Sequence, residues 1–260
     1  MVEGYTLRQI AGHSGHSVST VRRIIRYWLE HPPEQGRDFS GHRYLVLDGT
    51  RFGRRKGIFA AMEAGRNELI YGSYGVSEGP SGLGPFCAYL SGGGLSPKSA
   101  TVDGNPHLNQ LLRRWWPRII LQRCLVHIQR QGLSWCRRRP KRTDAKRLRE
   151  LFLQVMSIRT PEQRNAFSTQ VYAWERRYGR HIARSPETGW VFSDLKRARS
   201  LLLTALPNMF HYLQDRRIPK STNALEGYFG RLKQKYRQHR GLSPKHRQAF
   251  FQWYLHLCQR

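Results

Sequence analysis

The chain has 260 residues, with 45 Lys and Arg against 17 Asp and Glu, and a formal net charge of +28. A compact fold with this charge repels itself unless a polyanion screens it, and nucleic acid is the expected polyanion. A hydrophobic content of 39% excludes a disordered basic tail. No stretch approaches the roughly 18 consecutive apolar residues of a membrane-spanning helix, so no membrane partner is expected.

Cysteine usage indicates a reducing compartment. The four cysteines have irregular spacing, and no signal peptide is evident at the N-terminus. We therefore expect a cytoplasmic, nucleoid-associated protein.

Residues 5–29 carry a helix-turn-helix pattern. Thr6 and Gln9 form a capping box, Gly15 supplies a turn, and Ser17 caps a second helix with apolar positions at helical spacing, namely Val21, Ile24, Ile25 and Trp28. In a helix-turn-helix the first turns of the second helix enter the major groove, where this chain offers Ser19, Thr20, Arg22 and Arg23. The alternative is that two short amphipathic helices separated by Gly have no DNA-binding role.

From about residue 43 the pattern becomes strand-like. Apolar runs at 44–48, 57–64 and 68–76 predict an antiparallel meander with a turn at 65–67. A short helix within 79–94, a fourth strand at 99–103, a helix carrying Leu108 to Trp115 and a fifth strand at 119–126 follow. Strands that alternate with helices predict an α/β layer, with strand four beside strand one and their carboxyl ends at one edge.

The rest of the chain has a helical pattern. Residues 136–215 show helical periodicity and no strand pattern, and a later helix presents Leu225, Phe229, Leu232 and Tyr236 to the core. We expect a helix-turn-helix region at 1–33, a first core part at 40–135, an all-helical insertion at 136–215, and a final core helix and tail at 216–260.

Three acids are isolated in basic sequence. Asp48 closes the first strand run, Asp103 is the only carboxylate between Glu78 and Asp144, and Glu226 is the only one after Asp215. Each has a structural explanation, because Asp48-Gly49 and Asp103-Gly104 are turn dipeptides and Glu226 sits three residues after Asn223 in a capping-box-like pair. Turns and caps do not explain why these are the only acids over long stretches.

Phosphodiester cleavage suits such a set of acids. Two divalent ions stabilise the attacking and leaving oxygens of an in-line displacement, and hard ions such as Mg²⁺ take oxygen ligands. The three acids therefore predict a divalent-metal site that acts on nucleic acid.

The order of these motifs resembles the DDE transposases of bacterial insertion sequences related to the plant Mutator elements. The resemblance runs from about residue 43 to 241: strand and Asp48, strand and Asp103, Cys124-Leu125-Val126-His127, helical insertion, then Ser221-Thr222-Asn223-Ala224-Leu225-Glu226. It implies a ribonuclease H-like core, an α/β fold with a mixed five-stranded sheet interrupted by a helical insertion. Asp48, Asp103 and Glu226 would bind two Mg²⁺ or Mn²⁺ ions, with Asp48 bridging both.

The same resemblance places Cys124 and His127 near the catalytic centre as accessory residues. The alternative is a buried cysteine in the fifth strand and an ordinary surface histidine. A structural zinc site would need about four ligands, which the other cysteines do not complete.

The expected partner is double-stranded DNA at the element ends and at the target, with Lys233 and Arg237 along the substrate backbone on the face of Glu226. Basic clusters at 54–56 and 137–142 are further phosphate contacts or solvated surface. Two element ends must be brought together, which implies at least a homodimer. The rival hypotheses are a DNA-binding relative that does not cut and a ribonuclease H-like nuclease without strand transfer.

Overall fold

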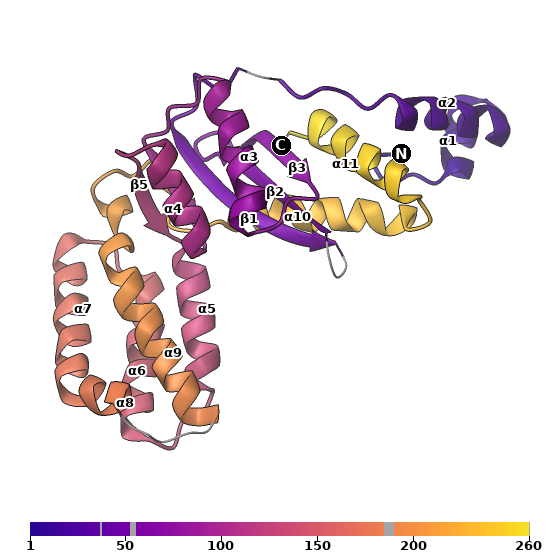
Figure 1. The fold of residues 1–260 in the computed structure, drawn as a ribbon. Coiled ribbons are helices and arrows are strands. Elements are labelled where there is room, and N and C mark those ends of the chain that lie inside the picture. Colours follow the sequence, from indigo (N-terminus) through magenta and orange to yellow (C-terminus); the bar gives the residue numbers. More distant parts are fainter. Residues whose placement is uncertain (37, 53–55, 185–189, 260) are drawn as a thin grey trace. The chain divides into compact units, whose positions relative to one another are not determined.

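A computed structural model describes residues 1–36, 38–52, 56–184 and 190–259 (Figure 1). Contacts between residues divide the chain into two units. Unit 1 comprises Met1–Pro97, Pro106–Arg118 and Asn223–Arg260, and unit 2 comprises Lys98–Asn105 and Ile119–Thr222. The chain therefore enters unit 2 twice.

The N-terminal helices form where the capping residues predict them. Helix α1 (Leu7–Ser14) has the Thr6–Gln9 capping box and ends at Gly15 in the left-handed conformation, with φ 70°. Helix α2 (Val18–Glu30) is capped by the Ser17 side chain, which accepts from the Thr20 amide. The predicted apolar face of α2 is partly wrong, because Ile24 and Trp28 are 43% and 50% exposed.

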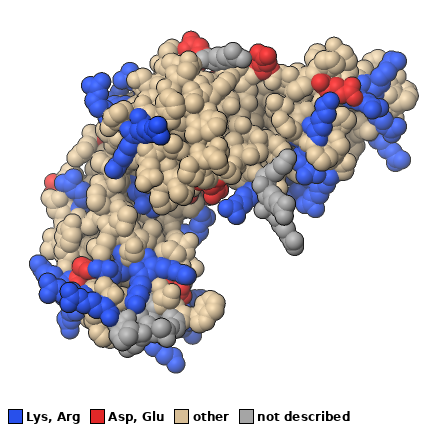
Figure 2. All heavy atoms as spheres, in the orientation of Figure 1, with Lys and Arg blue, Asp and Glu red and all other residues tan. Residues whose placement is uncertain are grey.

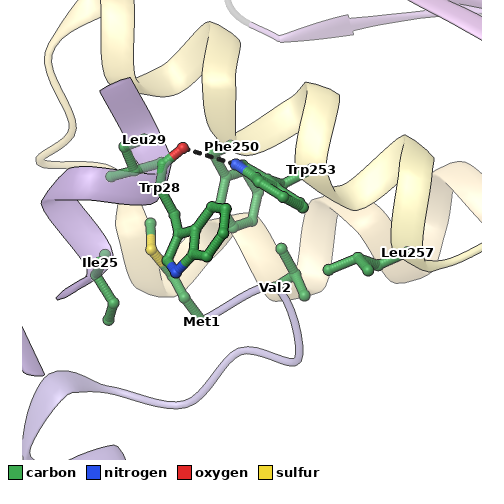
Figure 3. A pocket seen from close by; sticks show the side chains of 8 residues that line it. All are labelled: Met1, Val2, Ile25, Trp28, Leu29, Phe250, Trp253 and Leu257. Carbon is green, nitrogen blue, oxygen red and sulfur yellow. Dashed lines mark hydrogen bonds between the residues drawn. The ribbon is translucent and has the colours of Figure 1, made fainter. Parts of the chain in front are cut away.

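Helix α2 also packs against α11 (Pro244–Leu257), the last helix of the chain. The Trp253 Nε1 donates to the Trp28 carbonyl at 2.8 Å, and the two indoles meet edge to face (Figure 3). Apolar side chains of α2, α11 and the first residues line the hollow between them, so Trp28 contributes to this contact and not to a core within the helix pair.

Three antiparallel strands follow in unit 1. Strand β1 (Tyr44–Phe52) pairs with β2 (Lys56–Glu63), and β2 pairs with β3 (Glu68–Tyr74). Asn67 takes a positive φ of 51° at the predicted turn. The register Asp48↔Ala60 and Phe52↔Lys56 extends β1 well beyond Asp48, so the prediction that Asp48 ends the strand was wrong.

The strand order of the sheet is β3-β2-β1-β4-β5, which confirms strand four beside strand one. In unit 2, β4 (Ser99–Val102) and β5 (Ile120–Arg123) are parallel, with Ser99 opposite Ile120. In unit 1, α3 (Pro80–Gly92) and α4 (Pro106–Trp115) pack on each other. The fold is thus α/β with a mixed five-stranded sheet.

The fifth strand is shorter than predicted. Cys124 is the N-cap residue of α5 (Leu125–Cys136), so residues 125 and 126 are helical and Cys124 is not a strand residue. A contact distant in sequence explains the early end of the strand, since the Leu125 amide donates to the Lys220 carbonyl at 2.9 Å and not to a sheet neighbour.

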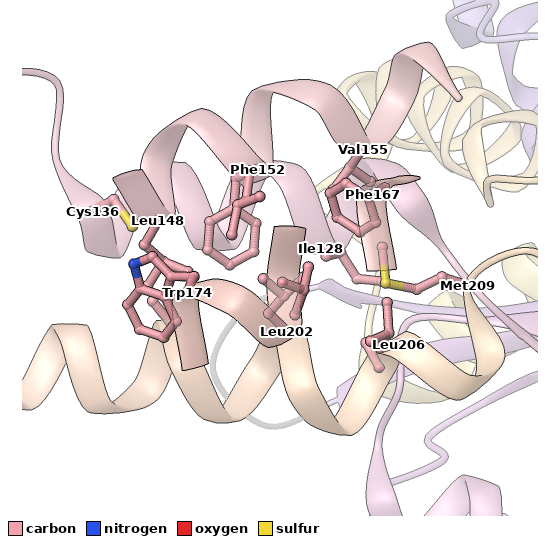
Figure 4. Packing of buried hydrophobic residues seen from close by; sticks show 14 of the residues in the cluster. Ile128, Cys136, Leu148, Phe152, Val155, Phe167, Trp174, Leu202, Leu206 and Met209 are labelled. Atoms are coloured by element: carbon pink, nitrogen blue, oxygen red, sulfur yellow. The ribbon is translucent and has the colours of Figure 1, made fainter. Parts of the chain in front are cut away.

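The rest of the described part of unit 2 consists of helices and the loops that join them, and its longer helices pack around one apolar cluster (Figure 4). Gly132 of α5 lets that helix approach Phe152, since a Cβ there would lie 2.2 Å from the Phe152 ring. The elements are α6 (Thr143–Gln154), η1 (Val155–Ser157), α7 (Pro161–Trp174), η2 (Glu175–Gly179), α8 (Arg180–Arg184), α9 (Trp190–Ala205), η3 (Leu206–Asn208) and η4 (His211–Leu213).

The chain returns to unit 1 at α10 (Asn223–Tyr236), followed by η5 (Arg237–His239) and α11. Leu225, Phe229 and Leu232 of α10 are buried in one cluster with Val46 of β1 and residues of α11. This packing holds the helix that carries Glu226 against the strand that carries Asp48. None of the described helices is long and apolar enough to cross a bilayer.

Candidate active site

Asp48 and Glu226 meet within unit 1. Their carboxylate oxygens lie within 4.8 Å of each other, and both side chains are half-buried. One comes from the middle of β1 and the other from the first turn of α10. Two carboxylates so close repel one another, and a bound cation relieves that repulsion.

The alternative explanations of these two acids do not fit their positions. Asp48 and Gly49 are paired in the β1–β2 ladder and do not form a turn. Helix α10 begins at Asn223, so the third helical residue, where a capping box needs its acid, is Leu225 and not Glu226. Asp48 Oδ1 accepts from the Gly49 amide at 2.8 Å.

Asp103 lies in unit 2, in the turn after β4. Its Oδ1 accepts from the Asn105 amide at 2.9 Å, and Gly104 has a φ of 102°, so the turn explanation holds for this pair. The turn has a further partner that the sequence did not indicate. Arg123, only 8% exposed, donates from Nη2 to the Asp103 carbonyl at 3.0 Å.

The position of Arg123 also explains why residue 104 is a glycine. A Cβ on Gly104 would lie 2.0 Å from the Arg123 Cζ, so only glycine leaves room for the guanidinium. Burial lowers the pKa of Arg123, and the charge of Asp103 opposes this shift. A buried cation thus braces the loop that carries the second predicted acid. An arginine at the end of a buried strand, directly before Cys124, was the available signal.

Cys124 is fully buried and accepts hydrogen bonds. The Thr222 amide and hydroxyl lie 3.4 Å and 3.6 Å from its Sγ. Burial raises the pKa of the Cys124 thiol, but hydrogen bonds from His127 and Thr222 outweigh burial and lower that pKa below its ordinary value. His127 is half-buried in the first turn of α5, which differs from an ordinary surface histidine.

These contacts also hold the segment before α10. Thr101 Oγ1 donates to the Pro219 carbonyl at 2.6 Å, and Thr222 directly precedes the helix. Unit 2 therefore anchors residues 219–222, where the chain enters the helix of Glu226. The sequence marked Thr222 only as part of the motif and did not indicate its bond to Cys124.

The predicted DNA-binding residues lie on two surfaces of unit 1. Ser19, Arg22 and Arg23 are exposed on α2, and Thr20 is half-buried. Lys233 and Arg237 follow Glu226 along α10 and η5. On the face shown in Figure 2, Lys and Arg side chains greatly outnumber acids. Residues 54 and 55 of the basic loop lie outside the described part of the chain.

The donors at Asp48 and Glu226 suit a hard divalent cation. Both offer carboxylate oxygens, which Mg²⁺ and Mn²⁺ take as ligands, and neither side chain offers sulfur. The pair does not resemble a structural zinc site.

An α/β fold with paired carboxylates and a strongly basic surface defines a nucleic-acid-processing class of protein. The family model described as Transposase, Mutator family, matches residues 62–250. The chain therefore belongs to the Mutator family of transposases, which implies a DNA-processing enzyme with DNA as its partner and use of a divalent metal. Comparison with curated proteins gave no match. The matched region contains Asp103, Cys124, His127 and Glu226 and begins after Asp48.

Proposed function

We propose that this transposase cleaves DNA at the ends of an insertion sequence and joins the ends to a target, with Asp48, Asp103 and Glu226 as its metal-binding acids. The observation that supports this most is the approach of Asp48 and Glu226, far apart in sequence, to within 4.8 Å. Asp103, on its braced loop in unit 2, is the third acid of the proposed set. The core is ribonuclease H-like, with 1–33 as a helix-turn-helix region and 136–215 as an inserted helical region.

Two divalent ions held by these acids would supply charge stabilisation for an in-line displacement at phosphorus. The packing of β1 on α10 keeps the carboxylates of Asp48 and Glu226 close together. Arg123 holds the Asp103 loop in place. Cys124 and His127 act as accessory residues at the start of α5, with His127 beside the processed strand.

DNA contacts are proposed on both basic surfaces. Ser19, Thr20, Arg22 and Arg23 would contact the element end through α2, and Lys233 and Arg237 would follow the backbone of the processed strand. The protein would act on the nucleoid as a homodimer or higher oligomer, because two element ends must be joined to one target.

A cleavage and joining assay on labelled element-end DNA with Mn²⁺ tests the proposal. Wild type should cut and join, and D103N should do neither while it still binds DNA. Cutting by D103N at the wild-type rate would refute the assignment of Asp103. Cleavage without joined product would favour the nuclease hypothesis, and binding without cleavage in wild type would favour a DNA-binding relative.

E226Q separates a catalytic role from a structural one. We expect a folded, DNA-bound and inactive protein, because the acid lies on a helix whose seam is formed by other residues. An unfolded E226Q, judged by circular dichroism, would show instead that Glu226 serves the helix start.

A further inference from the structure

A second cavity in unit 1 lies beyond the two acids along β1 and α10. Its volume is about 560 Å³. Five cations line it, contributed by the end of β1, by α10 and η5, by the residue after η5, and by α11: Arg51, Lys233, Arg237, Arg240 and Arg247. No carboxylate lines it among the described residues. Like charges gathered in one hollow repel each other, so the cavity favours an anionic occupant.

Two aromatic rings share the lining with these cations. Phe52 and Tyr236 meet edge to face with centroids 5.7 Å apart. The Lys233 Nζ lies 5.8 Å from the centre of the Phe52 ring, and the Arg247 Cζ lies 6.0 Å from that of Tyr236. The Nε of Arg247 is buried and has no hydrogen-bond partner within the part of the chain that the structure describes.

Aromatic rings beside cations favour single-stranded over double-stranded nucleic acid. Duplex phosphates need cations but no aromatic surface, because the bases of a duplex are stacked on each other. Rings beside cations suit an unpaired nucleotide, whose base has an open face and whose phosphate accepts from arginine forks. The cavity volume falls within the range of about 300–1,000 Å³ typical of small-ligand sites.

The cavity is aligned with the acid pair. Phe52 follows Asp48 by four residues and points to the same face of β1, since side chains of a strand alternate. Lys233 follows Glu226 by two helical turns, about 10 Å along α10. That span corresponds to about three nucleotides at the B-form spacing of 3.4 Å. A strand processed at the acids therefore reaches the cavity within a few nucleotides.

We propose that this cavity captures an unpaired nucleotide of the processed strand, with its base against Phe52 and Tyr236 and its phosphate among the arginines. The proposal rests on the proposed function and names the state of the DNA that the site takes: a frayed or single-stranded end next to the cleavage position.

Binding in EDTA tests this without any dependence on metal or catalysis. The probes are a blunt duplex and the same duplex with a short single-stranded overhang that carries 5-iodouracil. Wild type should bind the overhang at least about fivefold more tightly, the lower end of what one stacked base contributes. Irradiation should crosslink the iodouracil to Phe52 or Tyr236, as mapped by mass spectrometry.

Two variants then separate the contribution of base stacking to binding from that of phosphate contacts. F52L should lose the overhang preference but bind the blunt duplex as wild type does, and R240Q should weaken binding to both probes. Y172L is the matched control, since Tyr172 is a 55% exposed aromatic of α7. It should behave as wild type. Thermal melting checks that each variant is folded.

Equal affinity of wild type for the two probes, or crosslinks that map outside the cavity, would overturn the proposal even if F52L fails to fold. A protein that cuts DNA but shows no overhang preference would refute only the nucleotide site. A protein that shows the preference and the crosslink without cutting would refute only the catalytic assignment.

Discussion

Replacement of Gly104 by alanine tests whether Arg123 braces the loop of Asp103. The φ of 102° is strained for any residue with a side chain, at about 1–3 kcal/mol. The new Cβ would also lie 2.0 Å from the Arg123 Cζ and 2.1 Å from Nη2, so the guanidinium must move. Movement breaks the 3.0 Å bond to the Asp103 carbonyl. A hydrogen bond from a charged group contributes about 1.5–3 kcal/mol, so the sum is roughly 2.5–6 kcal/mol.

A double-mutant cycle in urea measures the two contributions separately. G104A should lower the free energy of unfolding by the full amount in the wild-type background. In the R123M background it should cost only the backbone strain, leaving a coupling energy of about 1.5–3 kcal/mol. G230A is the control, because Gly230 lies inside α10 with no neighbour within 4 Å of the added methyl group and should gain stability. Equal costs of G104A in both backgrounds would refute the brace.

Three further outcomes follow from the structure. Mn²⁺ at about ten times its dissociation constant should stabilise wild type by about 1.4 kcal/mol in a thermal shift assay, and E226Q should lose most of this gain; an undiminished shift would contradict the metal assignment. Burial raises the pKa of Cys136 to about 12, so its contribution to stability is present below the unfolded pKa of about 9 and is lost as pH rises toward 12. Between about pH 9 and pH 12, this thiol should lower the free energy of unfolding, measured in urea with reductant, by up to about 1.4 kcal/mol per pH unit. The free energy of unfolding of C136A should therefore fall less steeply with pH than that of wild type, and identical slopes would contradict this role of Cys136. G132A should destabilise unit 2 by about 1–3 kcal/mol or more, measured by urea unfolding, because the new Cβ overlaps the Phe152 ring; a neutral result would show that α5 and α6 separate easily.

Local signals in the sequence predicted most elements. Capping residues at Thr6 and Ser17 mark real helix starts, because a cap depends on a few neighbouring atoms. Strand ends were less predictable. The apolar run stops at Leu47, but ladder pairing continues to Phe52, and that pairing depends on the partner strand rather than on the residues of β1.

The same contrast between local signals and distant contacts explains why only part of the site could be predicted. Isolated acids stand out by charge, so Asp48 and Glu226 could be selected before their approach was known. The contacts of Arg123 with Asp103 and of Thr222 with Cys124 join residues distant in sequence. The position of Arg123 at the end of an apolar strand is the signal that distinguishes it among the 45 basic residues, but its burial results from the packing of the loop against the strand end.

The path of the chain between the two units has a consequence for partial gene products. Unit 1 is assembled from three separate stretches and unit 2 from two, and the acids are divided between them. A polypeptide that stops anywhere between Lys98 and Pro219 lacks α10 and α11 of unit 1 together with part of unit 2. Gene copies interrupted in this region would thus yield misfolded polypeptide, and not a stable DNA-binding fragment that competes with the intact enzyme.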